Sequence, residues 1–230
     1  MAAFHPAALG DLPAEIAVFP LPGALLLPRG RLPLNIFEPR YLAMTEDSLA
    51  PSQGRMFGMI QPDPGAPRLP TGPGLHRVGC LGRLSSFAET EDGRLLITLT
   101  GVIRFRVAGE LGMRRGYRRV QADYGPYASD LDLSVPPPPL DRAALLAALR
   151  PFFRARGIEA NWDSVERTSD DMLVLTLSMV CPFEVAEKQA LLEAETPARR
   201  AEMLIALLQM GAHEPGGAGG DLPPAGRRPS

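Results

Sequence analysis

A long stretch of alternating apolar and polar residues follows a tight turn near the middle of the chain. The turn is the segment 91–94, Glu-Asp-Gly-Arg, whose Asp-Gly pair tolerates the positive φ angles of a two-residue hairpin. A period of two indicates a half-buried strand, and Gly101 within the stretch predicts a bulge or bend. Because residues 78–88 can pair back across the turn, this part of the chain is expected to fold as antiparallel sheet. The apolar positions are Leu95, Ile97, Leu99, Ile103, Phe105 and Val107.

Further β-type segments surround this hairpin. Residues 16–27 are apolar and interrupted by prolines, which predicts two short strands or edge pieces around a Pro22-Gly23 turn. A helix is expected to open at Pro39, where the missing N–H costs nothing, and to end near Leu49. Strands are also expected at 32–37, 56–60 and 117–124, with a long exposed loop at 61–75.

A polyproline segment at 134–140 separates this pattern from a helical one. Helices are predicted from Asp141, from Thr168 as the cap of 172–181, over 183–194, and from Thr196 onward. Pro151 is expected to kink or end the first of them. We therefore predict an α+β protein, with a β-rich domain followed by a small C-terminal helical bundle. The expected parts are a flexible arm (1–14), the β-rich domain (15–133), the linker (134–140), the helical subdomain (141–210) and a disordered tail (211–230).

Composition excludes several functional classes. Lys188 is the single lysine among 24 Lys and Arg residues, and no glycine loop precedes it, so neither a P-loop nor a Ser-Lys protease site is encoded. Cys80 and Cys181 lie far apart and the 3 His form no cluster, so no metal site is expected. No catalytic residue and no cofactor are predicted. A net charge of -2 and the lack of a signal peptide or membrane segment favour a cytoplasmic protein.

Several motifs occur in the order that is typical of one protein family. Together they resemble the N-terminal, substrate-binding domain of Lon protease over about residues 15–210, and the combination is specific although each motif alone is weak. The motifs are 18–23 (Val-Phe-Pro-Leu-Pro-Gly), 33–41 (Pro-Leu-Asn-Ile-Phe-Glu-Pro-Arg-Tyr), 57–60, 78–82, 92–95, 101–107 (Gly-Val-Ile-Arg-Phe-Arg-Val) and 187–193 (Glu-Lys-Gln-Ala-Leu-Leu-Glu).

The resemblance implies a PUA-like pseudo-barrel followed by a helical subdomain. In full-length Lon proteases this region helps to capture polypeptide substrates. The ATPase and protease domains that follow it there have no counterpart here, so we expect a stand-alone, non-catalytic module that binds polypeptides. An adaptor or holdase linked to proteolysis fits this reading. The expected partners are unfolded or extended polypeptides and a separate ATP-dependent protease.

Two sets of residues follow from the family motifs. The first is a candidate surface for binding an extended polypeptide beside an exposed strand edge, although a core role is favoured for most of its apolar side chains. It consists of Phe19, Leu21, Leu25, Leu34, Phe37 and Tyr41. The second set is a structural signature at the helix start and the strand bend, with Glu38 and Arg40 as an ion pair. It consists of Glu38, Pro39, Arg40, Gly101, Arg104 and Phe105.

One basic cluster supports an alternative function. PUA-like folds include RNA binders, and Arg beside an aromatic ring is suited to nucleic acid. Since Arg replaces Lys throughout the chain, a solvated hairpin face explains the same residues more simply, and nucleic-acid binding is not favoured. The cluster consists of Arg114, Arg115, Tyr117, Arg118 and Arg119.

Overall fold

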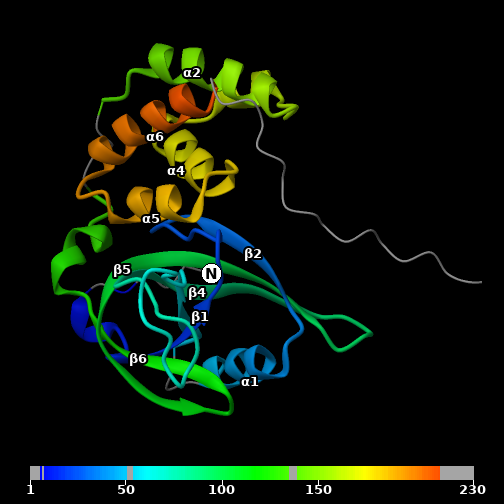
Figure 1. Ribbon diagram of the computed structural model, residues 1–230, viewed down its shortest axis with the longest axis vertical. Coiled ribbons are helices and arrows are strands. Elements are labelled where there is room, and N and C mark those ends of the chain that lie inside the picture. Colours follow the sequence, from blue (N-terminus) through cyan, green and yellow to red (C-terminus); the bar gives the residue numbers. More distant parts are fainter. Residues whose placement is uncertain (1–5, 7, 51–53, 135–138, 213–230) are drawn as a thin grey trace, which may run out of the picture.

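A computed structural model describes residues 6, 8–50, 54–134 and 139–212 of the chain. It confirms the α+β fold: a β-rich half with one helix on its side, and a helical half stacked on top of it (Figure 1). The centre of the polyproline segment, 135–138, and nearly all of the predicted tail, 213–230, lie outside the described residues.

The sheet has six strands and closes on itself. The strand order is β2-β5-β4-β3-β1-β6, and β5 also pairs with β6, so that β5, β4, β3, β1 and β6 form a closed ring with β2 outside it. β1 and β3 are parallel, whereas every other pair is antiparallel. Among the described strands β2 pairs only with β5, which makes it an edge strand. The bounds are β1 Glu15–Pro20, β2 Arg31–Ile36, β3 Met56–Ile60, β4 Val78–Glu89, β5 Leu95–Arg114 and β6 Tyr117–Asp123.

Strand β5 closes the barrel because it is long and bent. The register against β4 shifts between Leu81 and Gly82, opposite the Gly101 bend that the sequence predicts. A Cβ on Gly101 would lie 2.0 Å from the carbonyl oxygen of Leu27, so only glycine lets the chain cross here. The backbone of Gly101 bonds to Arg29 N and Gly30 O, both at 2.8 Å. The strand also runs on to Arg114, well past the predicted alternation.

The segment after β1 differs from the prediction. The expected Pro22-Gly23 turn forms, with Gly23 at φ 73°, but no second strand follows it. Leu25, Leu26 and Leu27 are all buried, and they pack as an irregular segment that crosses β5 at Gly101. Prolines on both sides of this segment limit ladder hydrogen bonding, so burial rather than strand pairing fixes it.

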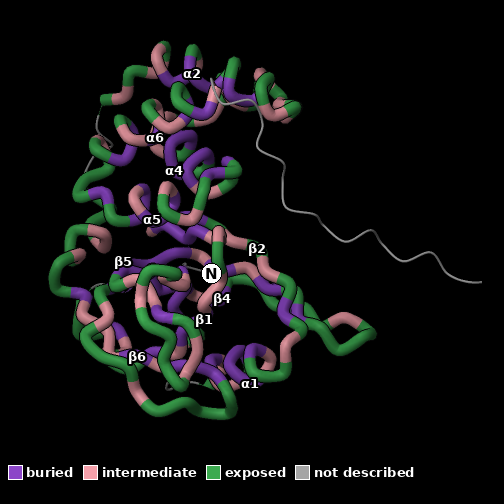
Figure 2. The backbone as a smooth tube through the Cα atoms, viewed as in Figure 1, coloured by how far each residue is buried: buried purple, intermediate pink, exposed green. Residues whose placement is uncertain are grey.

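The buried apolar residues form two cores. Buried stretches occur in both the strands and the helices (Figure 2). The smaller core lies among the strands and includes Val18, Ile103 and Phe105. It also takes in Leu12, and the hydroxyl of Tyr124 donates to the carbonyl of Pro13 at 2.8 Å, so this part of the predicted flexible arm is packed. The larger core joins the outer face of the sheet to the helices.

The helical half departs from the prediction around Thr168. Pro151, expected to kink or end its helix, lies inside a continuous helix and so does not end it. Ser169 rather than Thr168 precedes the first turn of α4, because Thr168 ends the unpredicted α3 and donates its hydroxyl to Ser164 O. Asp141 caps α2 as expected by accepting from Ala144 N at 2.9 Å. The bounds are α1 Pro39–Ser48, α2 Arg142–Ala155, α3 Trp162–Arg167, α4 Asp170–Val180, α5 Val185–Glu193 and α6 Pro197–Gly211.

Helix α5 joins the two halves, since it lies directly on the β-rich half (Figure 1). Lys188 Nζ donates to the carbonyl oxygen of Gly23 at 2.7 Å. The side-chain amide of Gln189 donates to Val78 O at 3.1 Å and accepts from Gln61 Nε2 at 3.1 Å. Lys188 and Gln189 of the Glu-Lys-Gln motif therefore help to fix the helices on the sheet.

Candidate functional site

A groove of about 460 Å³ lies between the two halves of the molecule. The β-rich half contributes Pro28, Arg29, Arg104 and the 3-10 helix Gly125–Leu131. The helical half contributes the first turns of α4 and α6. A space of this size is typical of ligand sites, which occur preferentially where two substructures meet.

The groove has apolar and polar walls. Leu140, Val174, Leu175, Pro197 and Ala201 supply apolar surface. The first turn of α6 is fixed by its cap, because the Thr196 hydroxyl accepts from Arg199 N at 3.1 Å. The polar wall is formed by ion pairs.

A buried ion pair between Arg104 and Asp130 lines this groove. The side chains of Arg104 and Asp130 are 4% and 11% exposed and meet at 2.9 Å. Burial alone would lower the pKa of Arg104, but the hydrogen bonds and charge of Asp130 outweigh it and raise that pKa. Nη1 of Arg104 also donates to Leu192 O and Ala194 O. The pair thus ties the sheet to the turn between α5 and α6.

The carboxylates of α4 are paired as well. Asp171 meets Arg29 at 2.8 Å, and Asp170 accepts from Arg142. A hydrogen bond from Ser169 and the Arg29 charge hold the pKa of Asp171 below its usual value, although partial burial opposes this. These pairs leave the groove with few uncompensated charges.

The residues predicted to bind polypeptide do not form one open surface, and none of them lines the groove. Phe19 and Tyr41 are buried against each other, with ring centroids 4.1 Å apart, and Leu25 is 2% exposed. Phe37, in contrast, is 59% exposed, so its ring is accessible to solvent. The set is completed by Leu21 and Leu34, which are half-buried. Phe19, Leu25 and Tyr41 therefore belong to the core, the role that the sequence favours for most of this set, because α1 covers Phe19 and places Tyr41 on it.

The signature residues have structural contacts. Arg40 donates to Glu38 Oε2 from Nε at 2.9 Å and from Nη2 at 2.7 Å, next to Pro39 at the first position of α1. The Arg40 guanidinium also lies over the ring of Tyr41, 4.5 Å from its centroid. Phe105 fills the barrel so tightly that a Cβ on Gly79 would lie 2.5 Å from its ring.

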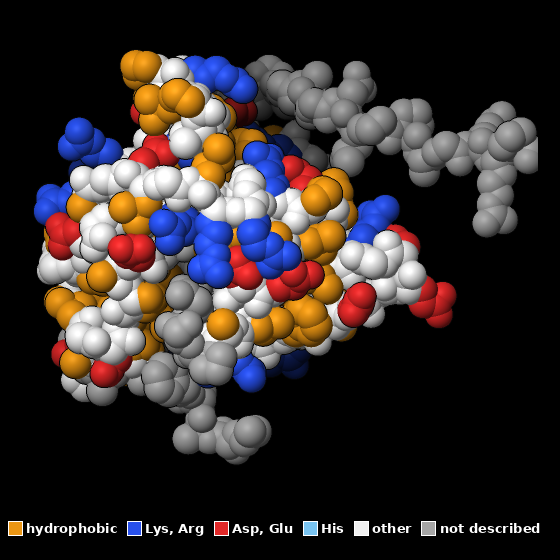
Figure 3. Space-filling view, turned by 90° about the horizontal axis from the view of Figure 1, so that it is seen from below, with side chains coloured by type: hydrophobic (Ala, Val, Ile, Leu, Met, Phe, Trp, Pro, Cys, Tyr) orange, Lys and Arg blue, Asp and Glu red, His pale blue; other side chains and the backbone are white. Residues whose placement is uncertain are grey.

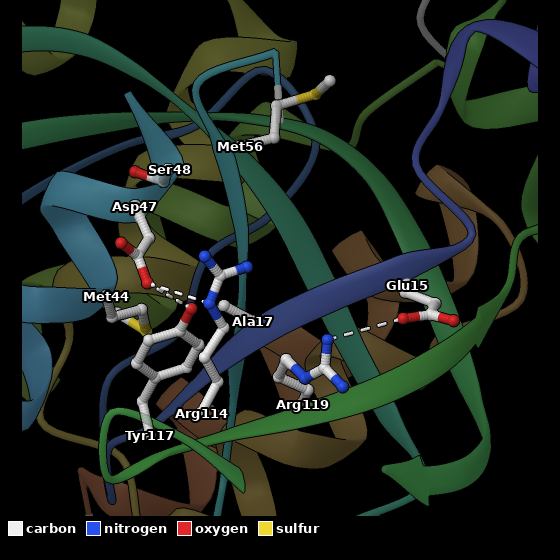
Figure 4. Close-up of a pocket in the computed structure, with 9 residues that line it drawn as sticks. All are labelled: Glu15, Ala17, Met44, Asp47, Ser48, Met56, Arg114, Tyr117 and Arg119. Atoms are coloured by element: carbon white, nitrogen blue, oxygen red, sulfur yellow. Dashed lines mark hydrogen bonds and ion pairs between the residues drawn. The ribbon is translucent and has the colours of Figure 1, made fainter. Parts of the chain in front are cut away.

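The basic cluster of the RNA hypothesis is neutralised by acidic neighbours. Arg114 pairs with Asp47 at 3.4 Å, and the Tyr117 hydroxyl donates to the same carboxylate at 2.8 Å (Figure 4). Arg115 pairs with Asp47 as well, at 2.8 Å. Tyr117 is 3% exposed, and its burial and this hydrogen bond raise its pKa to about 12. Its ring is therefore not available to stack on a base.

The remaining arginines of the cluster are paired too. Arg118 is 5% exposed and bonds to Glu110 and to the carbonyl oxygen of Pro73, while Arg119 meets Glu15 at 3.5 Å. In the view from below, basic and acidic side chains lie against one another near the centre of the face (Figure 3). The cavity in Figure 4 has a volume of only about 50 Å³. The expected open basic face is wrong for Tyr117 and Arg118, which are interior residues.

Other kinds of site find little support. Across the described ranges, no three His, Cys, Asp or Glu side chains come close enough to hold a metal ion. No helix within those ranges has the length and hydropathy that crossing a membrane requires. The thiols of Cys80 and Cys181 are buried, and burial raises the pKa of both, to about 12 for Cys181.

Sequence reasoning missed most of the groove. Its walls come from segments more than a hundred residues apart, such as Arg29 and Asp171, and no local motif links them. One signal was present: Arg200 falls on the same helical stripe as the buried Leu204 and Leu208. A charged residue on a buried stripe indicates a specific polar contact or a site.

Comparison with known proteins identifies the family. The model of the ATP-dependent protease La (LON) substrate-binding domain matches residues 15–210. The chain belongs to the LON substrate-binding domain family. Among solved structures, the LON domain resembles a Lon N-terminal domain protein from Xanthomonas campestris, with a TM-score of 0.57 and 23% identity over 84% of this chain and 97% of that one. Curated proteins gave no match.

A second solved structure has the same fold. It is the N-terminal domain of a Mycobacterium avium complex Lon protease, with a TM-score of 0.50 and 16% identity over 84% of this chain and 97% of that one. At these identities the likeness concerns the fold. It agrees with the combination of a closed sheet and a helical half in this LON domain.

Proposed function

We propose that this protein is a non-catalytic module that binds unfolded or extended polypeptides in the groove between its two halves. The observation that carries the proposal is the groove itself, about 460 Å³ in volume and lined by apolar side chains and ordered ion pairs. The family's description as a substrate-binding domain supports the class of ligand. A polypeptide in such a groove gains from apolar burial and from a few fixed polar contacts.

The proposed cellular role is that of an adaptor or holdase linked to proteolysis. A holdase needs only reversible binding of exposed apolar segments. An adaptor needs in addition a separate ATP-dependent protease, which would take over the bound chain. Suppression of aggregation by the isolated protein favours the first role, and stoichiometric recovery of such a protease from cell extract favours the second.

A substitution that fills part of the groove with a larger side chain tests the proposal. Ala198 lies in the first turn of α6, is half-buried and lines the groove. Ala198→Trp should fill part of that space and weaken binding of a permanently unfolded, carboxamidomethylated protein by about tenfold, or about 1.4 kcal/mol. Ala206→Trp is the matched control, because Ala206 is exposed elsewhere on the same helix. Equal binding by the two variants would contradict the proposed location.

RNA binding receives no comparable support. Its four candidate arginines pair with four carboxylates, so little positive charge is left for a phosphate. These carboxylates are Glu15, Glu46, Asp47 and Glu110. We expect the chain to bind the unfolded protein equally well with and without nuclease treatment.

A further inference from the structure

One cation in the groove lacks a counter-charge. Arg200 on α6 is 8% exposed, and its Nε donates to the carbonyl oxygen of Leu191 at 2.9 Å. Among the described residues no carboxylate lies within ion-pair distance of this guanidinium, and Nη1 and Nη2 have no hydrogen-bond acceptor. Buried arginines are almost always paired, because an isolated buried charge is costly. The unpaired guanidinium of Arg200 is therefore a specific feature of the groove.

Asp130 is a carboxylate whose charge acts on Arg200, but it does not pair with Arg200. Asp130 already accepts from Arg104 through both oxygens, at 2.9 Å from Nη2 to Oδ1 and 2.9 Å from Nε to Oδ2. The cluster thus contains two buried cations, Arg104 and Arg200, and one anion. Burial and the charge of Arg104 lower the pKa of Arg200 to about 10, which still leaves it charged at neutral pH.

Other carboxylates of the groove are engaged or lie at its rim. Asp170 and Asp171 pair with Arg142 and Arg29. Asp132 bonds to Ser134, and Glu195 is exposed. The cation of Arg200 therefore stays uncompensated inside the groove.

Helix α6 adds to the attraction for an anion. Pro197 and Ala198, in its first turn, line the same groove as Arg200. The N-terminal end of a helix carries a partial positive charge that favours a carboxylate. Two independent features, the unpaired guanidinium and the helix end, thus favour a ligand of the same charge.

We propose that the polypeptide bound in this groove presents a carboxylate to Arg200, either its C-terminal carboxylate or the side chain of an internal Asp or Glu. The inference rests on the proposed function and adds the group that the groove recognises. A guanidinium binds a carboxylate through two parallel N–H···O bonds, and Nη1 and Nη2 are the pair left open once Nε is bound to Leu191. The apolar wall at Val174 and Leu175 would contact the neighbouring residues of the peptide.

Three short peptides test this proposal on the full chain by fluorescence anisotropy. They share one N-terminally labelled, apolar sequence without other acidic residues: one has a free C-terminal carboxylate, one a C-terminal amide, and one an amide plus a single internal Glu. At least one carboxylate peptide should bind about tenfold more tightly than the plain amide. Which of the two does so identifies the source of the carboxylate.

Variants then link the preference to its residue. Arg200→Gln should remove the preference, so that the carboxylate peptides bind no more tightly than the plain amide. Arg200→Lys should retain part of it, because the charge remains but the paired donors do not. Glu195→Gln should strengthen binding of the carboxylate peptides about twofold, by removing a nearby negative charge.

The outcomes separate this inference from the proposed function. Equal binding of all three peptides would overturn the role of Arg200 and leave polypeptide binding intact, and so would an unchanged preference in folded Arg200→Gln. Failure of all three peptides to bind would overturn both. The comparison of peptides on the unaltered protein does not depend on whether a variant folds.

Discussion

Arg104 and Asp130 form a buried, two-point ion pair that holds the helical half of the LON domain on its barrel. Arg104 reaches Asp130 from Nε and Nη2, both at 2.9 Å, and its Nη1 bonds to the carbonyl oxygens of Leu192 and Ala194 at 3.2 and 2.7 Å. One side chain therefore fixes the sheet, the 3-10 segment and the α5–α6 turn relative to one another. The shape of the groove depends on this contact.

Removing Arg104 should be strongly destabilising. Arg104→Ala leaves Asp130 as an unpaired buried charge and two carbonyls without a donor, so the free energy of unfolding should fall by about 3–5 kcal/mol. Urea unfolding measures the change. Arg106→Ala, two residues along the same strand, is the control, because Arg106 is 53% exposed and its pair with Asp123 should contribute less than about 1 kcal/mol. Equal losses in the two variants would contradict this account.

Gly101 should not accept a side chain. A Cβ there would overlap the carbonyl oxygen of Leu27 at 2.0 Å, and that atom belongs to the backbone and cannot rotate away. Gly101→Ala should therefore lower the free energy of unfolding by about 3 kcal/mol or more and displace Pro28 and Arg29 at the groove. Gly109→Ala, in the same strand with open space around it, should change stability by less than about 1 kcal/mol.

The sequence predicts those parts of this fold that depend on local pattern. Alternation located β5, and Gly101 marked its bend, because both depend on neighbouring residues. The extension of β5 to Arg114 was missed, since that part is held by pairing with β6 rather than by a buried face of its own. Ser169, and not the predicted Thr168, precedes the first turn of α4. Thr168 instead ends α3, a helix that the sequence pattern did not predict.

The candidate site depends on long-range packing and was harder to predict. Phe19 and Tyr41 have the composition of a binding surface, yet α1 folds over β1 and buries both. The sequence shows the basic cluster, but two of its carboxylate partners, Glu15 and Asp47, come from β1 and α1, and only Glu110 lies in the same hairpin. Ion pairing between distant segments leaves no periodic signal in the sequence.

Asp47 should contribute stability that depends on pH. Although burial raises its pKa, hydrogen bonds from Tyr117 and Arg115 hold it below 3.8 overall. Its contribution is therefore complete above about pH 4 and is lost as the pH falls through the lowered pKa. Asp47→Asn should cost about 1–2 kcal/mol at neutral pH, and this difference should shrink below pH 4.

Thermal unfolding of the Asp47→Asn variant across that pH range measures the effect. Glu46→Gln is the control, because Glu46 is 59% exposed and contacts Arg115 from the surface. It should change stability by less than about 1 kcal/mol at every pH. A loss for Asp47→Asn that is constant with pH would contradict the role given to its charge.

The location of polypeptide binding is the central claim, and hydrogen–deuterium exchange tests it most directly. The full chain is compared with and without a saturating, permanently unfolded protein. We expect slower exchange in the segments that line the groove, at 129–132, 170–175 and 195–201. Protection confined to β2 and Phe37, or to the β5–β6 hairpin around Arg115, would contradict the account.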